Sequence, residues 1–434
     1  MLISFKVRNY KSFLDEAHLS AIAKSSEKSL PDTPIQAGPR LKILPAVAIY
    51  GSNASGKTNL LKALAYMKEA VGASHARWKP DSSTQIDPHT ANRKGTSLFE
   101  VEIMLDEVRY RYGFCGTITH FCEEWLYSYP KGRERILFHR RSRGDAVSHD
   151  DSFEFGSFLK GGKRDNSSTA RRTRQNSLFV SAGAQDNQED CLRIYNWFTE
   201  RVFQQTDPAT QGLEVQFTAR LARDFPKFKR LLLPTLRLAD ESISDVELLT
   251  EDGPSDDTSR DDAERFFREN LRIRTEFLVN IVGEVERLPF DRESRGTKKL
   301  YAVAGELITA LLVGGVLVID ELEASMHPHL ASRIVAIFQN KASNPNGAQL
   351  VFSTHESRLL NLKHLRRDQV WFVEKEDGKS SVYSLLEFSP RKDENFEAGY
   401  LRGRYGALPS LGISPEWIEL INTTTLKPSD RAGA

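Results

Sequence analysis

Alternating apolar and polar residues predict several strands in the first third of the chain. In Leu2–Phe13, the apolar residues Ile3, Phe5 and Val7 alternate with polar ones, which predicts a half-buried strand. Farther on, apolar segments separated by turn residues predict an antiparallel meander attached to the main sheet, with strands at Leu98–Asp106, Val108–Phe114, Glu124–Tyr129 and Arg135–Phe138.

Other apolar segments predict buried strands. Pro45–Tyr50 and Leu350–His355 are short apolar runs of this kind, and Ser177–Ser181 predicts a further strand. The longest apolar run, Tyr301–Ile319, is interrupted by a glutamate and a glycine pair. It therefore predicts a buried helix that turns into a buried strand, and not a membrane span.

The middle of the chain, Asn187–Leu288, is mostly helical in pattern. An acidic turn is predicted at Glu251–Asp262, and a helix is predicted to resume over Ala263–Leu288. Before it, Lys160–Asn176 has the composition of a mobile basic loop. Together with Arg133–Arg143, this loop is the best candidate for contacts with a phosphate backbone, although a solvated loop is the simpler interpretation.

The first buried strand leads into a glycine-rich loop and then a helix. The loop, Gly51-Ser-Asn-Ala-Ser-Gly56-Lys57-Thr58, has the G-x-x-x-x-G-K-[ST] pattern in its strand–loop–helix setting. Glycines let backbone N–H groups surround phosphate oxygens, and the start of the helix adds a favourable dipole. Lys57 would reach the β- and γ-phosphates, and Thr58 would hold Mg²⁺. The residues expected to bind ATP here are Gly51, Asn53, Ser55, Gly56, Lys57, Thr58 and Asn59.

Two later strands end in polar residues, at the edge where parallel α/β folds place catalysis. Val316–Ile319 is followed by Asp320 and Glu321. We expect Asp320 to orient Mg²⁺ through water, and Glu321 to act as general base on the attacking water. Such a strand end is common on ordinary surfaces, but the preceding P-loop favours the functional interpretation. His355, at the end of the next strand, is expected to hydrogen-bond a γ-phosphate.

The overall composition describes an ordinary globular protein. The 434 residues are 39% hydrophobic and 27% charged. The net charge of +1 requires any nucleic-acid binding to come from local basic patches. Three cysteines, none in a C-x-x-C pair, indicate free thiols in a reducing compartment. The first residues do not resemble a secretion signal, so we expect a cytoplasmic protein with no membrane association.

Three segments resemble the Walker A, Walker B and H-loop motifs of ABC-type ATPases. They are, in that order, Gly51–Thr58, Asp320–Glu321 and Ser353–His355. Ser294-Arg-Gly296-Thr297 resembles the ABC signature in a degenerate form, with Arg295 in place of a glycine and Thr297 in place of a glutamine. In ABC-type enzymes this element caps ATP bound to the opposite subunit. The resemblance therefore implies a homodimer that sandwiches ATP, with Ser294 and Gly296 as nucleotide contacts. The alternative is a helix N-cap formed by Ser294 or Thr297.

Three finer assignments also rest on resemblance. Asn9–Phe13 resembles the "N-F-R-S-F" strand of SMC- and RecF-like ATPases, in which the basic residue approaches the nucleotide, so Lys11 is a candidate contact. Gln185 is the candidate Q-loop residue because of its position, and would complete a metal site with Thr58 and Asp320. Glu323–Pro328 occupies the D-loop position, where His327 is expected in packing or a subunit contact.

The fold class implied is α/β: an ABC-type P-loop ATPase head with an antiparallel β subdomain and a helical insertion lobe. We expect an N-terminal ATPase lobe at 1–185, the helical lobe at 186–290, a C-terminal ATPase lobe at 291–390 and a tail at 391–434. Most of the chain resembles stand-alone bacterial ATPases, RecF/SMC/OLD-like, of the kind found in phage-defence and restriction loci; further segments that carry this resemblance are Glu123–Leu126, Ile136–Phe138, Arg366–Val373 and Arg404–Pro409.

Three functions follow from this resemblance. The first is an ATPase that acts as a nucleotide-gated sensor or scaffold in anti-phage defence, with a separately encoded nuclease or toxin-like effector. The second is a RecF-like DNA-binding ATPase in DNA repair. The third, a fused ATPase–nuclease, is disfavoured because the short segment after His355 contains no D-x-D pair. The neutral net charge favours the first function, while the basic clusters Arg133–Arg143 and Lys163–Arg174 keep DNA binding open. Assembly beyond a dimer also stays open.

Overall fold

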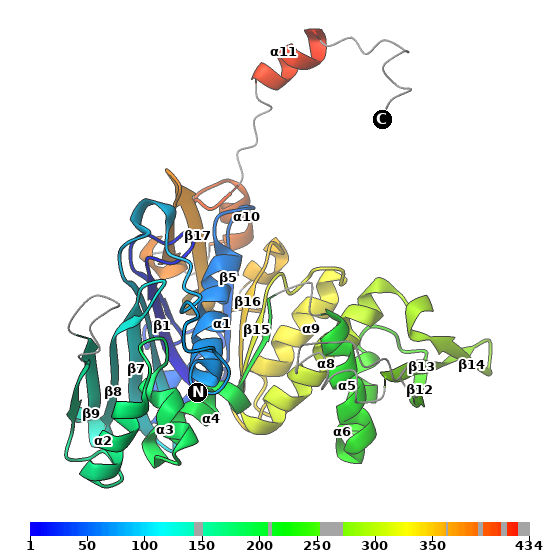
Figure 1. Cartoon of the computed structure of the whole chain (residues 1–434). Coiled ribbons are helices and arrows are strands. Elements are labelled where there is room, and N and C mark those ends of the chain that lie inside the picture. The colour runs from blue at the N-terminus through cyan, green and yellow to red at the C-terminus, as the bar shows by residue number, and fades with distance from the viewer. Residues whose placement is uncertain are drawn as a thin grey trace.

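The computed structural model describes residues 1–142, 151–206, 211–251, 272–361, 363–388, 394–408 and 415–423. In these residues an antiparallel sheet and a mostly parallel central sheet lie on either side of helix α1 (Lys57–Ala73). More helices cover the face of the central sheet that points away from α1 (Figure 1). This mixed α/β architecture agrees with the predicted fold class.

The central sheet has six strands in the order β11-β15-β16-β5-β17-β18. Neighbouring strands run parallel, except for the last pair, β17 and β18. Because the carboxyl ends of parallel strands meet at one edge, the segments after β5, β15 and β16 come together there. The strands are β11 (Val202–Gln205), β15 (Val316–Ile319), β16 (Gln349–Ser353), β5 (Ala46–Tyr50), β17 (Val370–Glu376) and β18 (Lys379–Ser384).

Both faces of the central sheet are buried, which explains its continuous apolar runs. On β5, Val47 and Ile49 belong to the core shared with α1 and the antiparallel sheet. The alternate residues Ala46, Ala48 and Tyr50 belong to a second core, built with helices α8 (Arg295–Val313) and α9 (Pro328–Gln339). The prediction of a helix followed by a strand in Tyr301–Ile319 is confirmed.

The predicted meander is also confirmed, and the N-terminal strand pairs with it. The antiparallel sheet has seven strands in the order β10-β9-β8-β7-β6-β1-β2. They are β10 (Asp151–Phe155), β9 (Arg135–Ser142), β8 (Phe121–Tyr129), β7 (Val108–Gly116), β6 (Ser97–Leu105), β1 (Leu2–Arg8) and β2 (Ala17–Ser20), and a small hairpin adds β3 (Ile35–Gly38) and β4 (Leu41–Ile43).

The strand predicted at Ser177–Ser181 is wrong, because these residues enter helix α3 (Phe179–Gln185). The cause is a long-range cap. The buried carboxylate of Glu124, on β8, accepts the N–H groups of Phe179 and Val180 at 2.5 and 3.0 Å. A carboxylate at the first turn stabilises a helix through its free N–H groups and its dipole. A local pattern cannot reveal a cap that comes from a distant strand.

The mobile basic loop predicted at Lys160–Asn176 is wrong as well. It contains helix α2 (Lys163–Arg172), and the segment after α2 is anchored by Arg174, which donates to the backbone carbonyls of Ser74, His75 and Trp78. Helix α4 (Glu189–Arg201) follows α3 and leads into β11.

The prediction of a mostly helical middle segment is only partly correct. Helices α5 (Gln211–Asp224) and α6 (Pro226–Leu236) are present, but a three-stranded antiparallel sheet follows, formed by β12 (Ile243–Glu251), β13 (Arg272–Ile281) and β14 (Glu284–Pro289). The helix predicted over Ala263–Leu288 is therefore wrong from residue 272 onward. Its earlier part, and residues 252–262 of the acidic turn, lie outside the described residues.

The β13–β14 hairpin has a clear sequence signal in retrospect. Alternate residues Ile273, Thr275, Phe277 and Val279 are buried, as expected of a strand. The two turn residues, Val282 and Gly283, both have positive φ, 52° and 89°, as in a type I′ turn. Near the end of the chain, α10 (Phe396–Leu401) and α11 (Pro415–Thr423) complete the helices. None of the described helices has the length and apolar character needed to cross a membrane.

Replacing Glu124 with Gln is expected to lower the free energy of unfolding by about 3 kcal/mol. The amide can accept only one of the two N–H bonds, and it removes one of the two negative charges beside the fully buried guanidinium of Arg140, which keeps only Asp151. Urea unfolding measures the loss. Glu123→Gln is the matched control, because that carboxylate is partly exposed and pairs with His139 and Arg141. Equal midpoints for the two variants would contradict the role of Glu124.

Candidate active site

The loop between β5 and α1 closes around the side chain of Lys57. Its Nζ donates to the backbone carbonyls of Gly51 and Ser52 at 2.8 and 2.9 Å. Ala54 and Gly56 have positive φ of 61° and 116°, which gives the loop its sharp turns. Burial lowers the pKa of Lys57, although the carboxylates of Asp320, Glu321 and Glu323 act in the opposite direction.

Close backbone packing explains the two glycines of this loop. A Cβ at Gly51 would lie 2.4 Å from the carbonyl oxygen of Val373, and one at Gly56 would lie 2.4 Å from Ser380 Oγ and 2.8 Å from Ser12 Oγ. Both serines also brace the loop. Ser380 Oγ donates to the carbonyl of Ser55, and Asn59 Nδ2 donates to Ser12 Oγ at 2.8 Å. Strand β18 and the turn after β1 therefore hold the loop in shape.

The loop fits a phosphate-bearing ligand. Ser55 Oγ is buried and has no hydrogen-bond partner among the described residues. Buried hydroxyls are normally paired, so an unpaired one in a glycine-lined loop fits a loop that receives a polar ligand. The start of the 17-residue helix α1 faces the same loop, and its free N–H groups favour an anion.

Thr58 and Asp320 meet at the carboxyl edge of the central sheet. Thr58 Oγ1 donates to Asp320 Oδ2 at 2.7 Å, and Ser353 Oγ donates to Asp320 Oδ1 at 2.5 Å. The hydroxyl and the carboxylate that meet at this edge supply oxygen atoms, which are the ligands that Mg²⁺ prefers. Thr58 and Asp320 could therefore hold this ion, as predicted from the sequence.

Ser353, the last residue of β16, was missed by sequence reasoning. Its Oγ also accepts the N–H of Glu321 at 2.7 Å, so one buried hydroxyl connects both acidic residues. Glu321 has a φ of 51°, in the left-handed region that non-glycine residues rarely adopt. The bond to Ser353 holds it there. A small hydroxyl residue at the end of a buried strand, one strand away from Asp-Glu, was the available signal.

His355 lies just beyond β16, beside Glu323. The carboxylate of Glu323 accepts from Thr354 Oγ1 at 2.7 Å and from the backbone N–H of His355 at 2.5 Å, which fixes the loop that carries the imidazole. Partial burial and the nearby charge of Lys57 lower the pKa of His355 below its ordinary value of 6.5. The ring is therefore neutral at pH 7, with one nitrogen to donate and one to accept.

The structure does not bring Gln185 to this edge, so its assignment as a metal ligand is wrong. It ends α3, whose Ser181 accepts the N–H of His75 beyond the last residue of α1. Thr58 lies at the opposite end of that helix. The physical reason is the missing strand at Ser177–Ser181, which leaves Gln185 with no sheet edge to occupy.

Strand β11 supplies glutamines where Gln185 was expected. It pairs with β15, and the N–H of Asp320 donates to the carbonyl of Gln205 at 2.9 Å. The Nε2 of the neighbouring Gln204 is buried and without a partner among the described residues. Gln204 and Gln205 were passed over because their segment has a helical pattern in sequence.

Lys11 precedes Ser12, which contacts the first turn of α1. Its Nζ pairs with Asp87 at 2.8 Å, and its neighbour Ser12 makes the contact with Asn59. His327 caps α9, with its Nδ1 accepting the N–H of His329 at 3.2 Å.

The signature-like segment forms the start of α8. Ser294 is its N-cap, and Ser294 Oγ accepts the N–H of Thr297 at 3.1 Å, which confirms the capping interpretation. Ser294 is exposed, and a Cβ at Gly296 would lie 3.4 Å from the carbonyl of Ser325. The segment thus packs beside the loop that follows Glu321.

The fold and these motifs define a P-loop ATPase of the ABC type. Residues 46–361 match the family described as "AAA domain, putative AbiEii toxin, Type IV TA system". The match covers more than half of the chain, so the protein belongs to this family. A comparison with curated proteins found no match.

Solved structures with a similar fold include three heads of SMC proteins. One is an SMC head bound to the C-winged helix domain of ScpA, with 15% identity, a TM-score of 0.44, and coverage of 90% of this chain and 99% of that chain. The SMC head domain from Thermotoga maritima has 12% identity, a TM-score of 0.40, and coverage of 88% and 98%. An Smc head with an extended coiled coil, bound to the C-terminal domain of ScpA derived from Pyrococcus furiosus, has 14% identity, a TM-score of 0.40, and coverage of 89% and 97%.

Ser353→Ala is expected to lower ATP turnover by about 10- to 100-fold, the usual effect of removing a group that orients metal ligands. ATP binding should persist, because the P-loop itself is unchanged, and the variant should need more Mg²⁺ for half-maximal turnover. Ser357→Ala is the control, since Ser357 Oγ bonds Glu397 and not the acidic pair. Wild-type turnover and Mg²⁺ dependence in Ser353→Ala would contradict the bridging role.

The pKa of His355 provides a second test. Lys57→Ala removes a positive charge that lowers this pKa, so the pKa should rise toward 6.5 in an NMR titration of the imidazole. In the unaltered protein, protonation is disfavoured in the folded state. His355 therefore costs stability as the pH falls below 6.5 and through the lowered pKa. Lys62→Ala, farther along α1, should leave the His355 pKa unchanged. An unchanged pKa in Lys57→Ala would show that this charge does not reach the ring.

Proposed function

We propose that this protein is an ATP-gated switch in bacterial anti-phage defence. Two copies close around ATP, hydrolysis to ADP and phosphate reopens them, and a separately encoded effector reads the state. The observation that carries this proposal is the contact network in which Thr58, Ser353 and the acidic pair meet at one sheet edge.

In this proposal each residue of the edge has one task. Lys57 binds the β- and γ-phosphates, and Thr58 and Asp320 hold Mg²⁺, which supplies positive charge against the phosphates. Glu321 accepts the proton of the attacking water, and neutral His355 donates a hydrogen bond to the γ-phosphate. Gln204 takes the role that was predicted for Gln185, near the bound Mg²⁺.

A second copy would complete the site through the start of α8. Three observations support this proposal. Ser294 is exposed at the N-terminus of a 19-residue helix, which favours anions. Arg295, Lys298 and Lys299 line one cavity beside it, of about 640 Å³. These cations fit the phosphates of ATP held by the other copy. The structure of one copy leaves assemblies larger than a dimer open.

The defence role and the effector rest on the family. Its description names a "putative AbiEii toxin" and a type IV toxin–antitoxin system, which fits a protein that acts together with a second protein. We propose that this partner is a separately encoded nuclease or toxin-like protein in the cytoplasm. A RecF-like DNA-repair ATPase is the second candidate. The basic residues of α2 favour it, because exposed cations on one helix fit a nucleic-acid backbone.

Lys57→Ala should abolish ATP turnover, and Glu321→Gln should abolish turnover while retaining ATP. Without its general base, Glu321→Gln is expected to accumulate as an ATP-bound dimer, measured by light scattering after size exclusion and by analysis of bound nucleotide. Glu376→Gln, an exposed carboxylate at the end of β17, is the control and should behave as wild type. If Glu321→Gln stays monomeric with ATP bound, the dimeric switch is wrong.

The same experiment with duplex DNA separates the two candidate functions. A dimer that forms with ATP alone supports a switch that signals to a protein partner. A dimer that forms only in the presence of duplex DNA supports the RecF-like function.

A further inference from the structure

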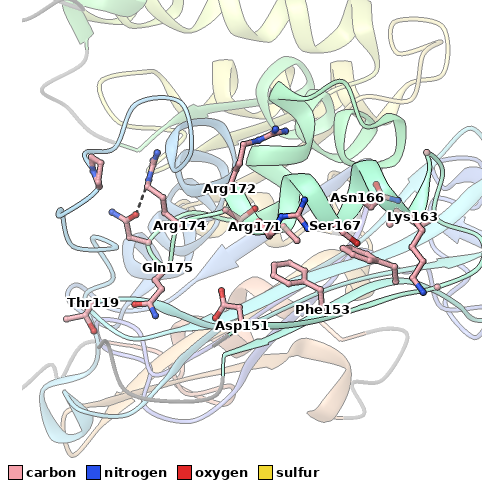
Figure 2. Close-up of a pocket in the computed structure, with 18 of the residues that line it drawn as sticks. Thr119, Asp151, Phe153, Lys163, Asn166, Ser167, Arg171, Arg172, Arg174 and Gln175 are labelled. Carbon is pink, nitrogen blue, oxygen red and sulfur yellow. Dashed lines mark hydrogen bonds between the residues drawn. The ribbon is translucent and has the colours of Figure 1, made fainter. Parts of the chain in front are cut away.

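A cavity of about 1230 Å³ lies between helix α2 and strand β10, and none of the predicted active-site residues lines it. One wall is α2, and the facing wall is β10, the edge strand of the antiparallel sheet. Residues 80–82 and 173–176 also line it. Figure 2 shows side chains of α2, including Arg171 and Ser167, on one side of this groove and Phe153 and Asp151 on the other.

The helix side of the groove carries two cationic side chains that make no ion pair among the described residues. Four cations line it, and two of them are already engaged. Arg172 pairs with Asp186, and Arg174 donates to the backbone carbonyls of Ser74 and His75, just after α1. Lys163 and Arg171 are exposed and have no ion-pair partner among the described residues. Their charges are therefore free to bind an anion.

The strand side of the groove carries aromatic rings. Phe153 and Phe155 are alternate residues of β10, so they share one face of the strand. Their rings stack at 5.8 Å with an angle of 26°, and both remain half-buried, not fully covered. Arg140 lies 5.7 Å from the Phe153 ring on its buried side. A planar ligand could stack on the part of the rings that faces the groove.

Asp151 adds an acceptor beside these rings. Its Oδ2 accepts two bonds from Arg140, at 2.9 and 2.7 Å, which neutralises the carboxylate. Its Oδ1 is buried and has no partner among the described residues. An unpaired buried oxygen is costly unless a ligand donates to it, and the exocyclic amino group of a nucleobase is such a donor.

We propose that this groove binds single-stranded nucleic acid. Lys163 and Arg171, about 12 Å apart along α2, contact two phosphates of the strand, Phe153 stacks with a base, and Asp151 Oδ1 accepts from a base amino group. A basic groove with aromatic platforms is the usual design for binding single strands. The volume exceeds the 300–1,000 Å³, roughly, of pockets for small molecules, so it fits several nucleotides better than one. A duplex hides its bases from such rings.

The groove is also bonded to the P-loop helix. Arg174, in its wall, donates to the carbonyl of Ser74, the C-cap residue of α1. The opposite end of α1 carries Lys57 and Thr58. Binding in the groove and ATP binding therefore act on the two ends of one helix, but the binding itself does not depend on the proposed switch.

The test is fluorescence anisotropy with a labelled single strand of about twelve nucleotides, in a DNA and an RNA version, without ATP and at several salt concentrations. The double variant Lys163→Ala/Arg171→Ala should bind about tenfold more weakly, and its salt dependence should fall by about 1.4, or 0.7 for each lost phosphate contact. Phe153→Leu keeps an apolar side chain against Phe179 but removes the ring on which a base would stack. It should weaken binding about tenfold without changing the salt dependence.

Arg164→Ala is the matched control, because Arg164 is an exposed cation of the same helix that does not line the groove. Binding of either strand type with this pattern of variants supports the proposal. The strand that binds more tightly, DNA or RNA, identifies the class of nucleic acid. The proposal is overturned if neither strand binds at low salt, if a duplex binds as tightly as a single strand, or if Arg164→Ala weakens binding as much as the groove variants. Lys57→Ala should bind the strand normally, which separates this result from a failure of the ATP switch.

Discussion

The hydrogen bond between Thr58 and Asp320 depends on the register of three parallel strands. The two residues follow β5 and β15, which are not neighbours, because β16 lies between them. The bond therefore spans the end of β16. The last residue of β16, Ser353, donates a second hydrogen bond to Asp320. A slip of one residue in β16 would turn Ser353 to the other face of the sheet and break its bonds to Asp320 and Glu321. The buried apolar faces of the strands fix this register.

Helix α1 is held at both of its ends. Its start is held by the P-loop and Asp320, and its end is held by Arg174 through the carbonyls of Ser74, His75 and Trp78. A helix of 17 residues spans about 25 Å, so groups at its two ends are separated by most of the width of a domain. The antiparallel sheet contributes Glu124 and Arg140, whose buried charges position α3 and the segment after α2 against this same end.

The sequence predicted what local patterns and a strong motif determine. The P-loop, the acidic pair and the meander were predicted because glycines, strand-end carboxylates and alternation act over a few residues. The errors arose where distant residues decide the structure. Ser177–Ser181 became helical because Glu124 caps it from another strand, and Gln185 was misplaced for the same reason. The β13–β14 hairpin was predicted as a helix because the segments before it have a helical pattern, although its own residues alternate. Ser353 was not predicted as a site residue because the more reactive His355 lies two residues away.

We propose that two copies share each ATP site, and subunit mixing tests this proposal most directly. Lys57→Ala removes the P-loop lysine, and Gly296→Asp places a negative charge in the signature-like segment, so each variant alone should be inactive. In a mixed dimer, one site combines the intact P-loop of one copy with the intact signature-like segment of the other. The account predicts that mixing the two inactive proteins restores ATP turnover. If mixed dimers form and turnover stays absent, or if Gly296→Asp alone is fully active, the shared site is contradicted.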